Sequence, residues 1–322
     1  MITIGDFIDV YYKIQQRGLK FILSKFRFSS LKRTNSTFNE TKIAASNWWH
    51  IPLVRKRWNL LLTGKENLEY EDFLVQRFFL NKTDLNMLSL GCGIGSHEPK
   101  FAKYSQFQKI IGLDLAPKLI QAAQENTEKL NLKNLQYIAG NLYEMEFHKE
   151  KFDVVYFHSS LHHFENIDFL LKHKIAPILK NDGLLIINEY VGPNRIQHHK
   201  EQITSCRRAL STIPDKLKKR LFSKNIKKTI YRPGVLRMYI SDPSEAPESE
   251  NILPSIHRYF NPVLEKAYGG NILMPVLKDI SHHFLKDEEH INTTLKNLFD
   301  IEDSYLKNHH SDHLLGVYTL KQ

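Results

Sequence analysis

The chain has 322 residues and a formal net charge of +10, because 45 Lys and Arg outnumber 35 Asp and Glu. This length can bury a sizeable core, and no apolar run approaches the roughly 18 residues that a membrane span needs. Cys92 and Cys206 are the only cysteines, which disfavours a disulfide framework and predicts a cytoplasmic protein. Charged residues near the N-terminus argue against a signal peptide.

The N-terminal segment, residues 1–83, is predicted to be helical. Between Phe7 and Ile22, apolar residues recur at near-helical spacing with Lys and Arg among them. A basic amphipathic helix of this kind packs on its own domain or on a second copy of the chain, which would give a homodimer. The alternative is a peripheral contact with an anionic membrane.

A glycine-rich turn follows the first predicted strand. Residues 87–90 form an apolar run, and Gly91, Gly93 and Gly95 come directly after it. Glycines in such a turn permit unusual backbone conformations and let a bound ligand lie against the main chain. The same spacing also occurs in turns that bind nothing, so the neighbouring elements must support the interpretation.

Asp114 gives the first support. It ends a second predicted strand, where an acid can accept hydrogen bonds from both ribose hydroxyls of an adenosine-containing ligand. Strands that alternate with helices predict a parallel, doubly wound α/β sheet with its ligand across the carboxyl ends of the strands. The strands after the first are predicted at residues 109–113, 135–141, 152–158 and 183–189, with a helix at 118–130.

The sequence Leu-Ser-Leu-Gly-Cys-Gly-Ile-Gly at residues 88–95, together with Asp114, resembles the class I S-adenosylmethionine-dependent methyltransferases. The resemblance covers roughly residues 84–192. It implies a Rossmann-like seven-stranded sheet with S-adenosylmethionine as the cofactor. Ser89 departs from the family pattern, which often has an acid at this position.

The resemblance also implies which residues contact the cofactor. The three glycines would lie against its methionine part, and Asp114 would bind the ribose. Asn141 falls where an Asp commonly contacts the adenine amino group. The expected cofactor residues are Leu90, Gly91, Cys92, Gly93, Gly95, Asp114, Leu115, Asn141, Leu142 and His158.

Four regions follow from this resemblance. Residues 1–83 would form a lid or an oligomerisation segment, and residues 84–192 the cofactor-binding core. Residues 193–257 carry a basic run and then an acidic loop, and a connection of this length predicts an inserted substrate cap. Residues 258–322 would complete the sheet with an antiparallel pair of strands, at 262–270 and 313–320, and two extra helices.

A narrower resemblance concerns residues 48–55, 188–195 and 242–246, which look like segments of a bacterial subfamily of these enzymes. That subfamily is associated with glycans and natural products, but no substrate within it carries over to this chain. The methyl acceptor therefore stays open. Trp49, Tyr190 and Arg195 are expected to contact the substrate, Trp49 as part of a lid. The alternative for the Trp49 segment is an ordinary packed helix.

A hydroxyl acceptor would require a base, and histidine titrates in the suitable range. His162 and His163 follow the fourth strand and are the first candidates. Their alternative role is to line or position the cofactor. Glu189, at the end of the fifth strand, is a further candidate base, and a salt bridge to Arg195 is its alternative role.

No metal is predicted, because the histidines form no complete ligand set with cysteines or acids. The positive charge would suit nucleic acid, but residues 158–163 lack the Asn/Asp-Pro-Pro-Tyr/Phe signature of enzymes that methylate base amino groups. The sequence therefore predicts O-methylation of a small or medium-sized acceptor, such as a natural product, a glycan or a lipid-linked precursor. The alternatives are an RNA or protein methyltransferase, or a catalytically silent protein that binds the cofactor and a partner.

Overall fold

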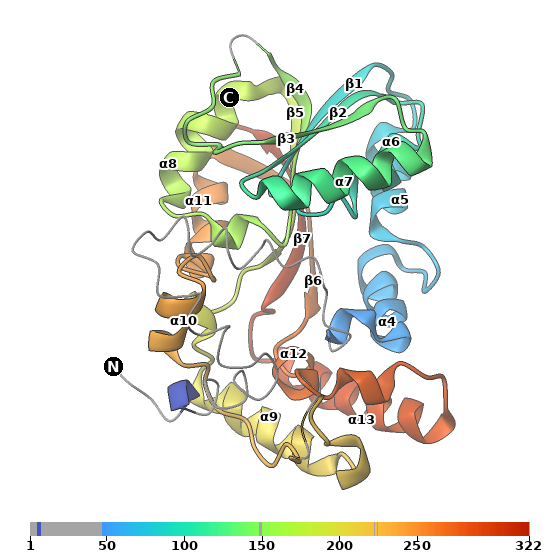
Figure 1. Cartoon of the computed structure of the whole chain (residues 1–322), viewed down its shortest axis with the longest axis vertical. Helices are drawn as coiled ribbons and strands as arrows, with labels where there is room; N and C mark the ends of the chain where they lie inside the picture. The colour runs from blue at the N-terminus through green and yellow to red at the C-terminus, as the bar shows by residue number, and fades with distance from the viewer. Residues whose placement is uncertain (1–4, 8–46, 148–149, 222, 224, 322) are drawn as a thin grey trace.

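The computed structural model describes residues 5–7, 47–147, 150–221, 223 and 225–321. A seven-stranded sheet with the order β3-β2-β1-β4-β5-β7-β6 forms its centre (Figure 1). The first five strands pair in parallel, and β7 lies antiparallel between β5 and β6. The predicted Rossmann-like α/β fold, with an antiparallel pair completing the sheet, is confirmed.

The strands lie close to their predicted positions. β5 begins at Leu179, before the predicted start at residue 183, because a register shift between Phe152 and Val154 of β4 lets Leu179 pair with Phe152. β3 ends at Ala139, because the chain turns at Asn141. The strands are β1 (Leu85–Leu90), β2 (Phe107–Asp114), β3 (Leu135–Ala139), β4 (Phe152–His158), β5 (Leu179–Tyr190), β6 (Phe260–Gly269) and β7 (His313–Leu320).

Helices cover both faces of the sheet. Helices α5, α6 and α7 lie on one face, and α8 and α11 lie on the other (Figure 1). The helices are α4 (Pro52–Thr63), α5 (Tyr70–Leu74), α6 (Glu98–Ala102), α7 (Pro117–Leu130), α8 (Ile167–Leu170), α9 (Lys200–Thr212), α10 (Val235–Ser241), α11 (Ile252–Tyr259), α12 (Leu273–Leu277) and α13 (Glu289–Leu306).

The central strands are buried on both faces, as parallel strands between two helical layers must be. In β1, Met87 packs in one cluster with Phe101 of α6 and Ile120 of α7. The next residue, Leu88, packs in a second cluster with Leu170 of α8. Side chains alternate between the two faces of a strand, so consecutive residues contribute to different cores.

A third hydrophobic cluster lies beyond the end of the sheet, among α4, α9, α12 and α13 (Figure 1). Helix α9 of the inserted segment therefore packs on helices of the last region of the chain. The predicted amphipathic helix between residues 7 and 22 lies outside the described residues, apart from Phe7. Within the described part of the chain, no helix combines the length and apolar character needed to cross a membrane. Cys92 and Cys206 are free thiols.

The buried carboxylate of Glu302, in α13, joins this helical layer to the sheet. Its Oε1 accepts the backbone N–H groups of Gly270, Ile272 and Leu273 at 3.0, 2.9 and 3.1 Å. The side chain is fully buried. These bonds fix the turn by which β6 leads into α12.

Glu302→Ala should lower the free energy of unfolding by about 3 kcal/mol, because buried N–H groups would lose their acceptor. The control is Asp182→Ala, since the exposed carboxylate of Asp182 makes a surface ion pair with the exposed Lys82, worth at most about 1 kcal/mol. Urea unfolding followed by circular dichroism measures both variants. Equal losses in the two would contradict the role assigned to Glu302.

Candidate active site

The turn between β1 and α6 is a glycine loop, residues 91–95. Gly91, Gly93 and Gly95 all have positive φ, at 71°, 57° and 71°. A Cβ at Gly91 would lie 2.5 Å from the Cβ of Ser160, so the close approach of the loop to the end of β4 requires glycine. A Cβ at Gly93 would meet no described atom within 4 Å. The loop therefore leaves room for a ligand beside its backbone.

Asp114 ends β2 next to this loop. Its Oδ2 accepts the N–H of Gly93 at 2.9 Å, and its Oδ1 accepts the N–H of Ala116 at 2.8 Å. Burial raises the pKa of the Asp114 carboxyl, and these N–H groups oppose the rise. A carboxylate oxygen can accept more than one hydrogen bond, so the arrangement fits a ligand that offers two ribose hydroxyls.

The residues expected around the adenine lie on the same edge of the sheet, because β3 pairs with β2 through Asp114 and Ala139. The Oδ1 of Asn141 accepts the N–H of Tyr143 at 3.1 Å, so this side chain shapes the turn after β3. Leu142 is buried, and Leu115, after β2, is half-buried. Their place fits the predicted role, which stays a prediction.

The chain turns sharply at the end of β4. Ser159 has a φ of 47°, a conformation that costs energy for residues other than glycine. This turn brings the hydroxyl of Ser160 to the carbonyl of Leu90, to which it donates at 2.7 Å. The carboxyl ends of β1 and β4 are therefore held together.

A buried carboxylate in β5 holds this turn. The Oε1 of Glu189 accepts the N–H groups of Ser160 and Leu161 at 2.7 Å each, and its Oε2 bonds Nδ1 of His162 at 2.6 Å. Burial lowers the pKa of His162, but the charge of Glu189 and this hydrogen bond outweigh burial, so the pKa lies above its usual value. Because Nδ1 is occupied, Nε2 is the ring nitrogen that can accept a proton.

His158 belongs to a polar network at the end of β4. Its Nδ1 bonds the hydroxyl of Tyr70 at 2.8 Å, and its ring lies 3.6 Å from that of His97 between centroids. Tyr70 also bonds the hydroxyl of Tyr156. Burial, and then the charge of His97, hold the pKa of His158 well below its usual value, which favours the neutral imidazole. No sequence motif marks Tyr70 or His97 as members of this network.

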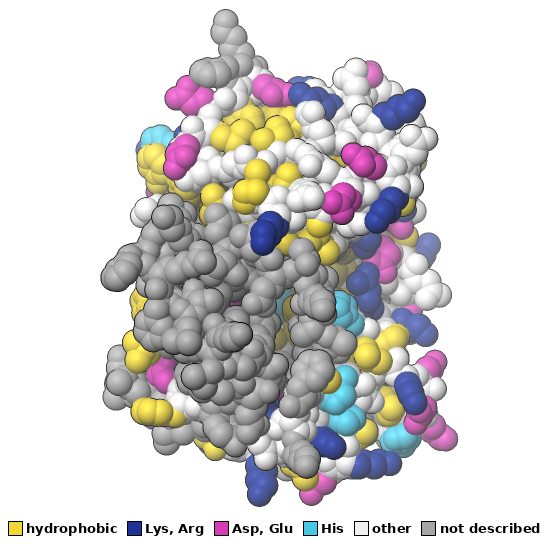
Figure 2. Space-filling model, in the orientation of Figure 1, with side chains coloured by type: hydrophobic (Ala, Val, Ile, Leu, Met, Phe, Trp, Pro, Cys, Tyr) yellow, Lys and Arg dark blue, Asp and Glu magenta, His cyan; other side chains and the backbone are white. Residues whose placement is uncertain are grey.

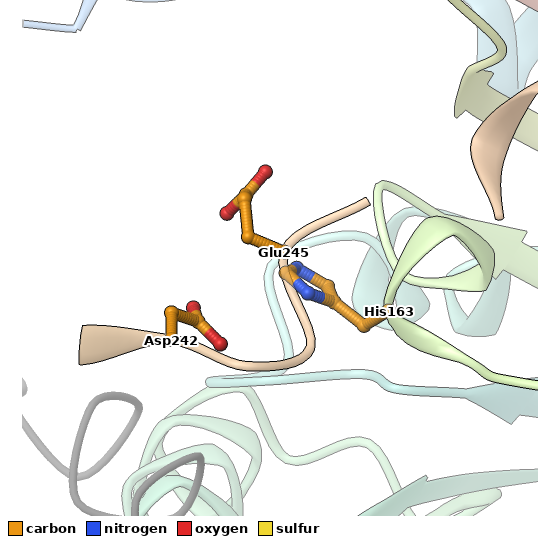
Figure 3. A group of neighbouring side chains, drawn as sticks. All are labelled: His163, Asp242 and Glu245. Carbon is orange, nitrogen blue, oxygen red and sulfur yellow. The ribbon is translucent and has the colours of Figure 1, made fainter. Parts of the chain in front are cut away.

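His163 faces two acids of the inserted segment (Figure 3). One ligand atom from each of His163, Asp242 and Glu245 lies within 4.8 Å of the others. Such a group can ligate a divalent cation, and sequence spacing gave no sign of it. His163 already donates from Nδ1 to the Ser244 carbonyl at 3.1 Å, and both His163 and Glu245 make further interactions. The group therefore also ties the inserted loop to the end of β4 without an ion.

Two of the expected substrate residues lie where β5 leads into the inserted segment. Tyr190 is buried, and its ring centroid lies 6.2 Å from that of His162. Arg195 donates from Nη1 to the carbonyls of Pro243 and Glu245. Its guanidinium thus holds the inserted loop, and the salt bridge that was considered between Arg195 and Glu189 is replaced by the bond from Glu189 to His162.

The segment before α4 turns Trp48, rather than Trp49, toward the interior. Trp49 is 42% exposed. The buried ring of Trp48 lies 5.5 Å from that of His313, which in turn lies 5.4 Å from that of Tyr190. Trp48, His313 and Tyr190, here called the aromatic wall, border the site. Trp48 belongs to the segment 48–55 that carries the narrower resemblance, but Trp49 was expected there instead, and His313 was expected only to begin a strand.

Charged side chains are mixed on the face drawn in Figure 2. There, among the described residues, Lys and Arg lie among Asp and Glu and do not gather into a single patch. The basic run of the inserted segment includes Lys227, which is buried and donates to the carbonyls of Pro275, Val276 and Lys278 at the end of α12. Part of that run therefore stabilises the fold.

Comparison with known proteins gives the family. A family model described as a methyltransferase domain matches residues 81–262, more than half of the chain. The sterol 24-C-methyltransferase of Candida albicans is 26% identical over 134 residues, 41% of this chain and 35% of that protein. The ubiquinone biosynthesis O-methyltransferase of Pelagibacter ubique is 28% identical over 123 residues, 38% of this chain and 49% of that protein. These matches span at most about half the length of either relative.

Among solved structures, phosphoethanolamine N-methyltransferase 2 of Haemonchus contortus, determined with S-adenosylmethionine, has a TM-score of 0.52 at 17% identity and covers 90% of this chain and 60% of that chain. This likeness shows the fold. The family model, the sheet order and the glycine loop agree with it. The chain belongs to the class I S-adenosylmethionine-dependent methyltransferases, and S-adenosylmethionine is its cofactor.

Proposed function

We propose that the protein transfers a methyl group to a hydroxyl of a small or medium-sized acceptor. The observation that carries this proposal is the pair of His162 and Glu189, which lies beside the glycine loop at the end of β4. A histidine whose Nδ1 is held by a carboxylate is arranged to take a proton through Nε2. A hydroxyl is a weak nucleophile until its proton is taken, so this geometry favours oxygen as the acceptor atom.

When bound, S-adenosylmethionine supplies a methyl group that is activated by its positively charged sulfur. Asp114 would hold the ribose of the cofactor and the glycine loop its methionine part, which together orient it. Glu189 keeps His162 in one orientation and stabilises the imidazolium that forms when His162 takes the acceptor proton. Glu189 itself is not the base, because it is fully buried and both of its oxygens accept hydrogen bonds.

The proposal of a small or medium-sized acceptor draws on two elements that lie near His162. The aromatic wall borders one side, and the inserted loop, tied down by His163 and Arg195, borders another. We therefore assign residues 193–257 as the substrate cap. The related proteins methylate different atoms, so they do not choose between a natural product, a glycan and a lipid-linked precursor. Homodimer formation, peripheral membrane contact, a bacterial source and a cytoplasmic location stay predictions.

Asp114→Ala should weaken the binding of S-adenosylmethionine by about 1–3 kcal/mol, because the bonds to the ribose hydroxyls are lost. Isothermal titration calorimetry measures this change. Asp168→Ala is the control, since it removes a surface carboxylate of α8 that pairs with Arg258, and it should bind like the wild type. Unchanged affinity in Asp114→Ala would remove Asp114 from the cofactor site.

His162→Gln should lower kcat by roughly 10²–10⁴-fold, the range for loss of a general base, with little change in cofactor affinity. The assay uses an acceptor that the wild type methylates in a screen with labelled methyl donor. Equal losses in kcat and in affinity would instead make His162 a cofactor-positioning residue. His163→Gln tests the neighbouring imidazole, and a larger loss there would move the role of base to His163.

The pH profile of kcat should report the raised pKa of His162. Only the neutral imidazole can act as a base, so the rate should rise with pH along a limb above the usual histidine value. Glu189→Gln removes the charge that raises this pKa, so the limb should move to lower pH while the maximum rate falls. A limb that stays in place in Glu189→Gln would show that His162 does not control the rate.

A further inference from the structure

Glu98 is a buried acid directly after the glycine loop. The residue is only 2% exposed to solvent. Its Oε1 accepts the hydroxyl of Ser89 at 2.6 Å. Its Oε2 is also buried and has no hydrogen-bond partner among the described residues. Ser89 of β1, which stands where the family often has an acid, therefore bonds an acid from the next element, α6.

This carboxylate lies next to the glycine loop, because Glu98 begins the helix after the loop and bonds Ser89 in the strand before it. Burial raises the pKa of the Cys92 thiol, and the charge of Glu98 raises it further. The pKa of Tyr137 is raised in the same way, first by burial and then by Glu98. The Tyr137 hydroxyl donates to the carbonyl of Gly95 at 3.4 Å. Glu98 thus lies between β1, β3 and the loop itself.

A buried carboxylate is costly unless N–H groups or a positive charge lie nearby. Burial raises the pKa of Glu98, while the hydroxyl of Ser89 and then the charge of His97 lower it. The methionine end of the cofactor carries an ammonium group and a carboxylate on one carbon, and two methylene groups separate that carbon from the positive sulfur. A ligand that lies on the open side of Gly93 would bring the ammonium group to the loop next to Glu98.

We propose that Glu98 supplies a negative charge next to the glycine loop that favours the ammonium group at the methionine end of the cofactor. This inference rests on the cofactor-binding part of the proposed function. Because both oxygens of Glu98 are buried, the residue acts through the loop and is a positioning residue. Glu98 of α6 would thereby supply the negative charge that an acid at position 89 would supply. The hydroxyl of Ser89 bonds Glu98 and so joins the two positions.

The test compares two ligands on three proteins by isothermal titration calorimetry. S-Adenosylhomocysteine carries the amino acid end, whereas 5′-methylthioadenosine has the adenosine and the sulfur but no ammonium group. The proteins are the wild type, Glu98→Gln, which keeps the size of the side chain and an acceptor for Ser89, and the exchange variant Ser89→Glu/Glu98→Ser.

Glu98→Gln should bind S-adenosylhomocysteine roughly tenfold more weakly, as expected for loss of a charge several ångströms away in a partly buried site. Its affinity for 5′-methylthioadenosine should stay within about twofold of the wild type, because that ligand lacks the ammonium group. The exchange variant should recover the affinity for S-adenosylhomocysteine, since it returns a carboxylate to the same place from β1.

Equal weakening of both ligands would overturn the inference, because Glu98 would then only support the fold of the loop. Unchanged binding of S-adenosylhomocysteine by Glu98→Gln would overturn it as well. If the exchange variant fails to fold, the affinities of Glu98→Gln for the two ligands still test the inference. A wild type that binds neither ligand would instead contradict the proposed function, so the two failures are distinct.

Discussion

The buried carboxylate of Glu189 is the constraint on which the active site depends. A charge without contact with water is tolerated only where its hydrogen bonds are satisfied. Here the main chain after β4 and the imidazole of His162 satisfy them. The same bonds fix the strained turn at Ser159 and the orientation of His162. The backbone after β4 and the orientation of the His162 imidazole are therefore set by one side chain and change together when it is altered.

Parallel pairing brings the rest of the site to Glu189. Strands β1, β2, β4 and β5 end on one edge of the sheet, so the glycine loop, Asp114 and His162 meet there although they are far apart in the sequence. The antiparallel strand β7 begins at the same edge, where His313 pairs directly with Tyr190. This pairing explains how a strand near the C-terminus contributes to the aromatic wall.

The strands and the cofactor loop could be predicted because local patterns encode them: apolar runs, glycine spacing and Asp114 at a strand end. Local patterns could not choose between His162 and His163 as the proposed base. His162 and His163 are adjacent in the chain, and what distinguishes them is that Glu189 contacts one and the Ser244 carbonyl contacts the other.

Residues whose roles come from tertiary packing carry no local signal. Trp48 and Tyr70 approach the site only because the helical segment before β1 folds against the end of the sheet.

A crystal structure of the complex with S-adenosylhomocysteine would test the account most directly. We expect its ribose hydroxyls on Asp114 and its sulfur facing His162, with space between them for an acceptor. A sulfur turned away from His162, or a ribose remote from Asp114, would contradict the account.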